Sequence, residues 1–220
     1  MLNYRTIIFA LSVCFLLVSC NGNTDLTSDE LILEHFSKNE ANNLQEIHEF
    51  FTREICTIDD TDNSSQASCY EEFLDYNDKE LPSSDPNIES IRIKDPIRPG
   101  RQVEFFEKLD TNLFDEIWIR HYYKRDDSTT TVTIGIKSSG RYIDFLAALG
   151  NEYESIEQYK NNIISDSKLK TTDGRVLEGF MTMKTQKHVL NNPDEFDVHD
   201  VKIRLVLAIH YLTLFYDKEV

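Results

Sequence analysis

Hydrophobic residues recur in the first part of the chain at the three- and four-residue spacing of an amphipathic helix. The apolar positions that share this spacing are Leu33, Phe36, Leu44, Ile47, Phe51 and Ile55. Thr27 and Glu30 precede most of them with the spacing of a capping box, in which the two side chains satisfy backbone N–H groups. The pattern predicts a helix over residues 28–54.

The same periodicity predicts further helices downstream. One short helix is expected to begin near Tyr70. The others are expected to cover residues 102–112, 142–149, 152–166 and 175–190. A glycine at position 150 is expected to end one of them in a left-handed conformation. Prolines between residues 82 and 99 indicate an irregular connector, with a short strand expected at residues 88–93.

Strand character is concentrated in two neighbouring segments. Residues 129–137 are rich in β-branched side chains and alternate between apolar and polar positions from Val132 to Ile136. Residues 116–124 precede them, and residues 125–128 provide a polar turn. This arrangement predicts an antiparallel β-hairpin, which a third strand could extend.

The segment 200–216 fits two patterns. Its apolar residues alternate as in a strand, but it is also long and apolar on every side, and Asp200 stands where a helix N-cap would be. A buried helix explains these features better than a strand. The predicted fold class is therefore α+β: a mostly helical single domain over residues 28–220 with a small antiparallel β-hairpin, following a cleaved signal peptide.

The N-terminus has the features of an export signal. Arg5 is the only charged residue before Asp25, and an apolar run follows it from Ile7 to Val18. This run is shorter than the ~20 apolar residues needed to span a bilayer. Residues 1–19 are therefore expected to be a cleavable signal peptide.

The signal ends in Leu17-Val18-Ser19-Cys20, which resembles the lipobox of bacterial lipoproteins. That resemblance implies that Cys20 carries a thioether-linked lipid and becomes the first mature residue, with residues 20–27 as a lipidated tether. Two or three acyl chains hold a protein firmly to a bilayer. Asn21, where Asp would suggest retention in the inner membrane, implies the outer membrane, on its periplasmic face or at the cell surface.

The last third of the chain is similar to uncharacterised exported proteins of the Bacteroidota. The similarity is carried by the stretch Ile203-Arg-Leu-Val-Leu-Ala-Ile-His-Tyr-Leu-Thr-Leu214. It implies an exported protein and brings no known activity with it.

The balance of charge restricts the classes of partner. The formal net charge is −16, and loss of Arg5 with the signal makes it −17. Nucleic acid is excluded as a partner, because binding to phosphates requires clustered Lys and Arg. A cationic protein remains an allowed partner, although acidity also simply keeps an exported protein soluble.

The cysteines predict one disulfide bond. Cys14 leaves with the signal and Cys20 is acylated, so Cys56 and Cys69 remain as a closely spaced pair. An oxidising compartment favours their pairing, which stabilises by roughly 3 kcal/mol in the chain-entropy model. The spacing is unlike that of a Cys-x-x-Cys redox motif.

The region around this pair also resembles a calcium-binding loop. Its oxygen-bearing side chains fall at positions 1, 3, 5 and 12 of an EF-hand: Asp60, Asp62, Ser64 and Glu71. The match fails at Ser65, where the loop requires Gly, and at Ala67, where it requires a larger apolar residue. The six histidines form no His-Glu-x-x-His motif. We therefore expect neither a metal nor another cofactor.

Trp118, Arg120 and Tyr122 would share one face of the first hairpin strand. The rings could stack on a sugar while the guanidinium binds a hydroxyl or carboxylate. An aromatic stripe of this kind is also typical of a core. The sequence contains no nucleophile elbow and no phosphate loop, and its acidic pairs are too common to indicate acid–base catalysis.

These observations favour a membrane-anchored, non-enzymatic binding module and assign no catalytic residue. A glycan-binding accessory protein that uses the Trp118 stripe is the first alternative. A hydrolase whose Asp, Glu and His residues converge without a contiguous motif is the second.

Overall fold

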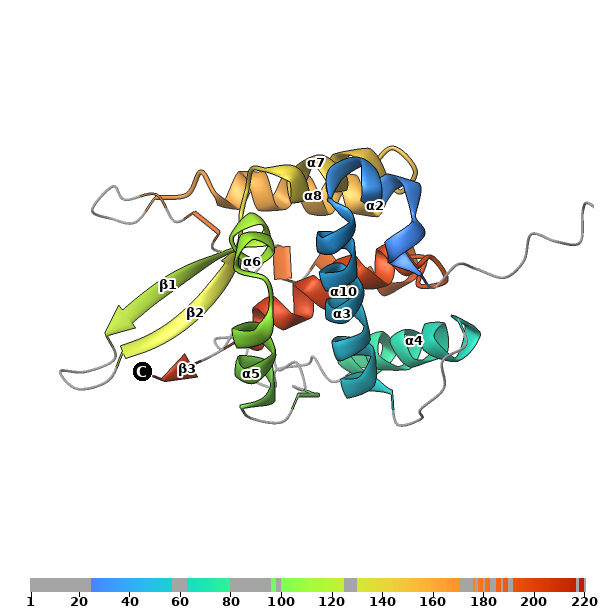
Figure 1. Ribbon diagram of the computed structural model, residues 1–220, viewed down its shortest axis with the longest axis horizontal. Helices are drawn as coiled ribbons and strands as arrows, with labels where there is room; N and C mark the ends of the chain where they lie inside the picture. Colours follow the sequence, from blue (N-terminus) through green and yellow to red (C-terminus); the bar gives the residue numbers. More distant parts are fainter. Residues whose placement is uncertain are drawn as a thin grey trace, which may run out of the picture.

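The helix α10 (Val201–Leu214) lies at the centre of the computed structural model (Figure 1). The structure describes residues 25–56, 63–79, 96–97, 100–124, 130–170, 176, 178–179, 181–182, 185–186, 188–189, 192–216 and 218–219. Every side chain from Ile203 to Thr213 is buried, and α10 packs against α3 (Lys38–Ile55) and β2 (Thr130–Ile136). The Asp200 carboxylate accepts a hydrogen bond from the Lys202 N–H at 2.8 Å. The prediction of a buried, Asp-capped helix is confirmed.

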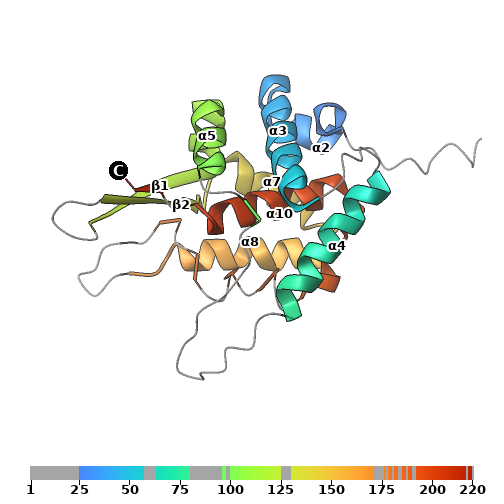
Figure 2. The same ribbon diagram turned by 90° about the horizontal axis from the view of Figure 1, so that it is seen from below.

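The domain is mostly helical, as predicted. The other helical segments are η1 (Leu26–Ser28), α2 (Glu30–His35), α4 (Asn63–Lys79), α5 (Arg101–Lys108), α6 (Thr111–Ile117), α7 (Arg141–Leu149), α8 (Glu154–Asp166) and η2 (Pro193–Glu195). Figure 2 shows α10 between α3 on one side and α8 on the other. The fold class is thus α+β, with helices on both sides of a fully buried one.

A three-stranded sheet completes the part of the domain that the structure describes. Strand β1 (Trp118–Lys124) pairs antiparallel with β2, in a register that runs from Trp118–Ile136 to Lys124–Thr130. The short β3 (Lys218–Glu219) pairs with the other edge of β2. Figure 1 shows the hairpin projecting from the helical body. The hairpin prediction is confirmed, but β1 begins later than expected because α6 continues through Ile117.

The first predicted helix is two helices. The chain is extended at Phe36, and Ser37 begins α3 with a capping box that pairs its side chain with Glu40. The capping box expected at Thr27 and Glu30 is wrong, because the Asp29 side chain caps α2 instead. The break also leaves Leu33, expected on the apolar face, exposed to solvent.

Two other sequence predictions need correction. The helix expected over residues 102–112 is interrupted after Lys108, because Asp110 caps α6 by accepting from the N–H groups of Asn112 and Leu113. Gly150 was expected in a left-handed conformation but has a φ of −65°, in the right-handed region.

Several predictions fall on residues that the structure does not describe. These are the signal peptide (1–19), Cys20, the first part of the tether and the strand at 88–93. Within the expected helix at 175–190, only residues 185–186 and 188–189 are described as helical. Among the described residues, no helix is long and apolar enough to cross a membrane.

Candidate functional site

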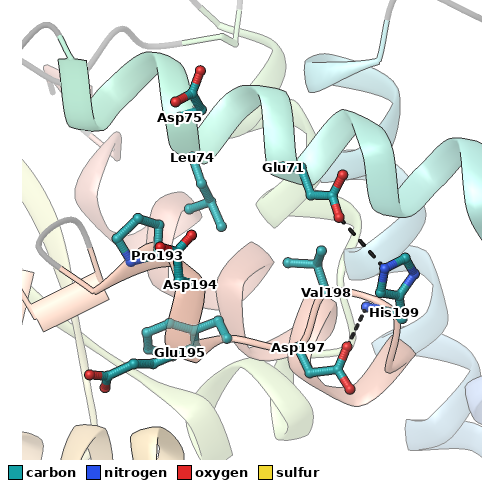
Figure 3. A pocket seen from close by; sticks show the side chains of 10 residues that line it. Glu71, Leu74, Asp75, Pro193, Asp194, Glu195, Asp197, Val198 and His199 are labelled. Atoms are coloured by element: carbon teal, nitrogen blue, oxygen red, sulfur yellow. Dashed lines mark hydrogen bonds and ion pairs between the residues drawn. The ribbon is translucent and has the colours of Figure 1, made fainter.

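An acidic groove separates α4 from the segment 193–199 (Figure 3). Its volume is about 660 Å³. The lining residues are Glu71, Leu74, Asp75, Pro193, Asp194, Glu195, Phe196, Asp197, Val198 and His199. This surface joins two parts of the chain that are more than a hundred residues apart in sequence.

The α4 wall is attached to the domain by its inner face. Ala67, Tyr70 and Leu74 recur at helical spacing and are buried. The Tyr70 hydroxyl lies 3.2 Å from Thr52 Oγ1. The helix begins at Asn63, well before the start expected near Tyr70. Glu71 and Asp75 border this buried stripe and are exposed to solvent, and in Figure 3 the Glu71 side chain reaches toward His199.

A disulfide bond between Cys56 and Cys69 confirms the predicted pairing, with a Cα–Cα separation of 5.4 Å. Cys56 is the C-cap of α3, and Cys69 lies within α4 two residues before Glu71. The bond therefore ties the acidic wall of the groove directly to one of the helices that contact α10.

The opposite wall is a short turn anchored by two buried apolar side chains, Phe196 and Val198. The Asp197 carboxylate accepts from the backbone N–H of His199 at 3.1 Å. Ser155 donates its hydroxyl to the carbonyl of Glu195 at 2.8 Å, which ties this wall to α8. These contacts give the irregular segment a defined shape.

The charges that line the groove are almost all negative. Five carboxylates are present: Glu71, Asp75, Asp194, Glu195 and Asp197. The described lining contains no Lys or Arg, and His199 is its basic side chain, with Nε2 3.6 Å from Glu71 Oε1. The side chains of Asp194 and Glu195 form no hydrogen bond or ion pair with the described residues. In Figure 3 the Asp194 side chain projects from η2 toward α4.

The Glu71–His199 pair is open to water. The Glu71 side chain is 56% exposed and that of His199 is 66% exposed. A general acid or base is usually held in a partly desolvated site, where its proton affinity can be tuned. This exposure favours binding over the hydrolase alternative.

The predicted sugar-binding stripe is divided between core and surface. Trp118 is 1% exposed, and its indole N–H donates to Thr213 Oγ1 at 2.9 Å. The Arg120 guanidinium lies 3.7 Å from the centroid of the Phe114 ring, while Tyr122 is 68% exposed. Trp118 therefore has no free ring face on which a sugar could stack, and the stripe loses its largest ring.

Two of the four residues of the calcium-like loop belong to a helix. Asp60 and Asp62 lie outside the described residues, whereas Ser64 and Glu71 lie on α4. A helical backbone from Asn63 onward differs from the loop that wraps around Ca²⁺. Within the described ranges, no three His, Cys, Asp or Glu side chains are placed to hold a metal ion.

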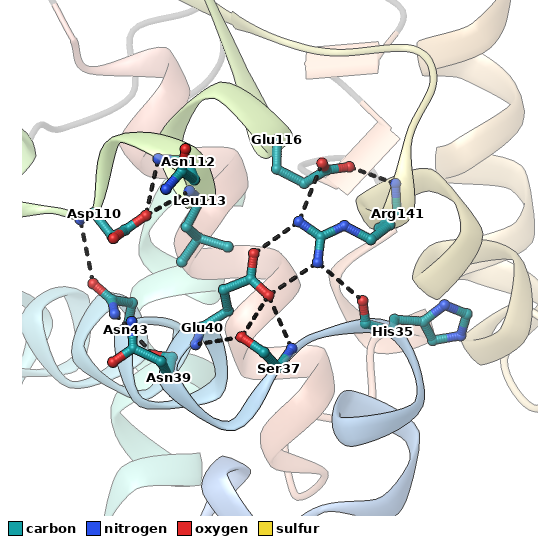
Figure 4. Close-up of polar contacts among 10 residues, drawn as sticks. All are labelled: His35, Ser37, Asn39, Glu40, Asn43, Asp110, Asn112, Leu113, Glu116 and Arg141. Atoms are coloured by element: carbon teal, nitrogen blue, oxygen red, sulfur yellow. Dashed lines mark hydrogen bonds and ion pairs between the residues drawn. The ribbon is translucent and has the colours of Figure 1, made fainter.

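A second charged cluster, at the start of α3, connects structural elements (Figure 4). Arg141 pairs with Glu40 and Glu116, and it donates to the carbonyl of His35 at 3.5 Å. The hydrogen bonds from Arg141 lower the pKa of Glu40 to about 2. The charges and hydrogen-bonding groups of this cluster satisfy one another. Its role is therefore structural, and it joins α2, α3, α6 and α7.

Sequence reasoning missed the 193–199 wall altogether. Its signal was an acidic run after a proline, Asp194-Glu195-Phe196-Asp197, but nothing in the sequence placed that run opposite Glu71. Comparisons with protein-family models, curated proteins and solved structures each find no match. The function is therefore inferred from the geometry of the site.

Proposed function

We propose that this chain is a membrane-anchored lipoprotein whose domain is a non-enzymatic binding module, and that its acidic groove binds a cationic segment of a protein partner. The observation that carries this proposal is the concentration of five carboxylates, without a Lys or Arg, in the described lining of one groove. The excess negative charge of the chain also attracts a cationic partner.

Physical reasons support a basic peptide segment as the ligand. Carboxylates gathered in a groove produce a negative potential that attracts cations and accelerates their association. Pro193 lines the groove, is only partly buried and contributes apolar surface beside the charges. The aliphatic stems of Lys and Arg can cover such surface while their charged ends meet the carboxylates.

The proposed anchor is the lipid on Cys20. The lipobox-like residues Leu17 to Cys20 support it. In this proposal the domain stands at the cell envelope, at the outer membrane. Cys20→Ser should abolish incorporation of labelled palmitate and release the protein from the membrane fraction. Unchanged labelling of that variant would contradict the anchor.

The groove can be tested with a fluorescent lysine-rich peptide. We expect the purified protein to bind it at low salt and to release it as salt rises, because screening weakens exposed charge pairs. Glu71→Gln with Asp197→Asn should weaken binding, since this double change removes one charge from each wall of the groove.

The matched control is Glu30→Gln with Glu34→Gln. It removes the same total charge from α2, outside the groove. Equal weakening by both double variants would mean that net charge, and not the groove, attracts the peptide. No binding of basic peptides at low salt would overturn the proposed function.

A further inference from the structure

The Arg204 side chain is fully buried near the start of α10. It forms no ion pair with a carboxylate among the described residues, and burial lowers its pKa below the ordinary value. Removing a guanidinium from water is costly unless its N–H groups are satisfied. The acceptors that surround Arg204 therefore decide what its burial does in the fold.

Neutral acceptors satisfy this guanidinium from three directions. The Arg204 Nε donates at 3.3 Å to Nε2 of His48, which belongs to α3. One terminal nitrogen donates to the carbonyl of Val198 at 2.7 Å and reaches that of His199 at 3.4 Å. The other donates to Asn63 Oδ1 at 2.6 Å. Arg204 thus contacts the first residue of α4 and the turn that faces α4, and these are the two walls of the groove.

We propose that Arg204 is the positioning residue of the acidic groove: its guanidinium sets the separation and alignment of the α4 wall and the 193–199 wall. This inference rests on the proposed function of the groove. Asn63 reinforces the link, because its side-chain amide also donates to the carbonyl of His199 at 3.4 Å. The planar fork of arginine suits this role, since it presents donors in several fixed directions.

The attachments of α4 to α3 do not perform the same task. The Cys56–Cys69 disulfide and the Tyr70–Thr52 contact both join α4 to the end of α3. Neither touches the segment 193–199. Arg204 donates to both walls, so its loss should change their relative position even when α4 stays attached.

The first test is hydrogen exchange, which does not require a ligand. Arg204→Lys keeps the charge but cannot span the same acceptors, so amide exchange should accelerate in residues 63–70 and 196–204. The matched control is Arg141→Lys, which disturbs an arginine that also bonds several partners but contacts neither groove wall. The control should accelerate exchange near Glu40 and Glu116 and leave both groove walls unchanged.

The second test is affinity for the lysine-rich peptide, measured well below the melting temperature of each variant. Arg204→Lys should weaken binding by roughly fivefold or more, a typical coupling between a site and the group that organises it. Arg141→Lys should lower stability without changing affinity. A merely structural Arg204 would lower the melting temperature and leave the dissociation constant unchanged, which would overturn the proposal.

Asn63→Ala is a second variant in case Arg204→Lys does not fold. It removes the acceptor on α4 and leaves the guanidinium and its other partners in place. It should accelerate exchange at the start of α4 and weaken peptide binding. If exchange changes at both walls but the wild type binds no basic peptide, the proposed function fails and Arg204 still positions the walls. Unchanged exchange at both walls would overturn the inference itself.

Discussion

Arg141 on α7 holds both carboxylate oxygens of Glu40 on α3, at 2.9 and 2.7 Å. The same carboxylate accepts from the backbone N–H of Ser37 at 2.9 Å and so completes the capping box of α3. One side chain therefore both begins a helix and joins it to another. The fork-to-carboxylate geometry is the strong form of a protein ion pair.

Glu40→Gln should destabilise the domain because it breaks this pair and weakens the cap. We expect the free energy of unfolding in urea to fall by about 1–2 kcal/mol, a value reduced because the Arg141 side chain is partly exposed. Glu157→Gln is a suitable control, since it removes a pair with Lys160 that lies within one helix and joins no second element. A Glu40→Gln variant as stable as that control would contradict the assigned role.

Stability should fall as the pH falls below neutrality. Burial lowers the pKa of His48 and of His210 to about 3, and it also lowers that of His121. The unfolded chain therefore binds protons near pH 6.5 that the folded chain rejects until about pH 3, so unfolding becomes easier across this window. Glu40, with its pKa lowered to about 2, adds a loss of stability below about pH 4.5.

Urea unfolding between pH 7.5 and pH 5 measures this effect. His48→Gln keeps an acceptor for Arg204 but removes one titrating group, so the dependence of stability on pH should become shallower. A stability that is constant or rises on acidification through this range would show that the buried histidines do not stay neutral.

Removing the disulfide should cost about 2–4 kcal/mol of stability. In Cys56→Ser with Cys69→Ser, the unfolded chain regains freedom that the bond withholds, and α4 loses its covalent tie to α3. The urea midpoint should decrease, and adding a reductant to the wild type should reproduce the midpoint of the double variant. A midpoint that neither treatment shifts would mean that the bond contributes little.

Gly135→Ala should destabilise the domain by about 1–3 kcal/mol, the usual range for overpacking a core. A Cβ at this position in β2 would overlap the backbone carbonyl of Gly179. Gly179 itself has a φ of +74°, which an L side chain rarely adopts, so the close approach depends on glycine at both positions. Thr133→Ala on the same strand is the control. Equal effects of both changes on thermal melting would argue against the close approach.

Local pattern was enough to predict much of the fold. The apolar run of α10 together with Asp200, the alternation of β2, and the spacing of Cys56 and Cys69 each predicted a feature that the structure confirms. These signals work because burial on all sides, pleated alternation and short loop closure act over a few residues. Helix breaks at Ser37 and Asp110 were missed, because a capping side chain can start a new helix while the spacing of apolar residues continues unchanged.

The sequence by itself determined the fold class, the acidity of the domain and the polar residues available for binding. Tertiary structure alone decided which of them meet: it buried Trp118 against Thr213, and it placed Glu71 opposite Asp194 and Asp197 across one groove. The reason is physical. Which side of a helix or strand faces water depends on the elements that pack against it. Arg204 likewise joins Asn63 to Val198, and the spacing of residues along the chain does not indicate that these two segments are close together.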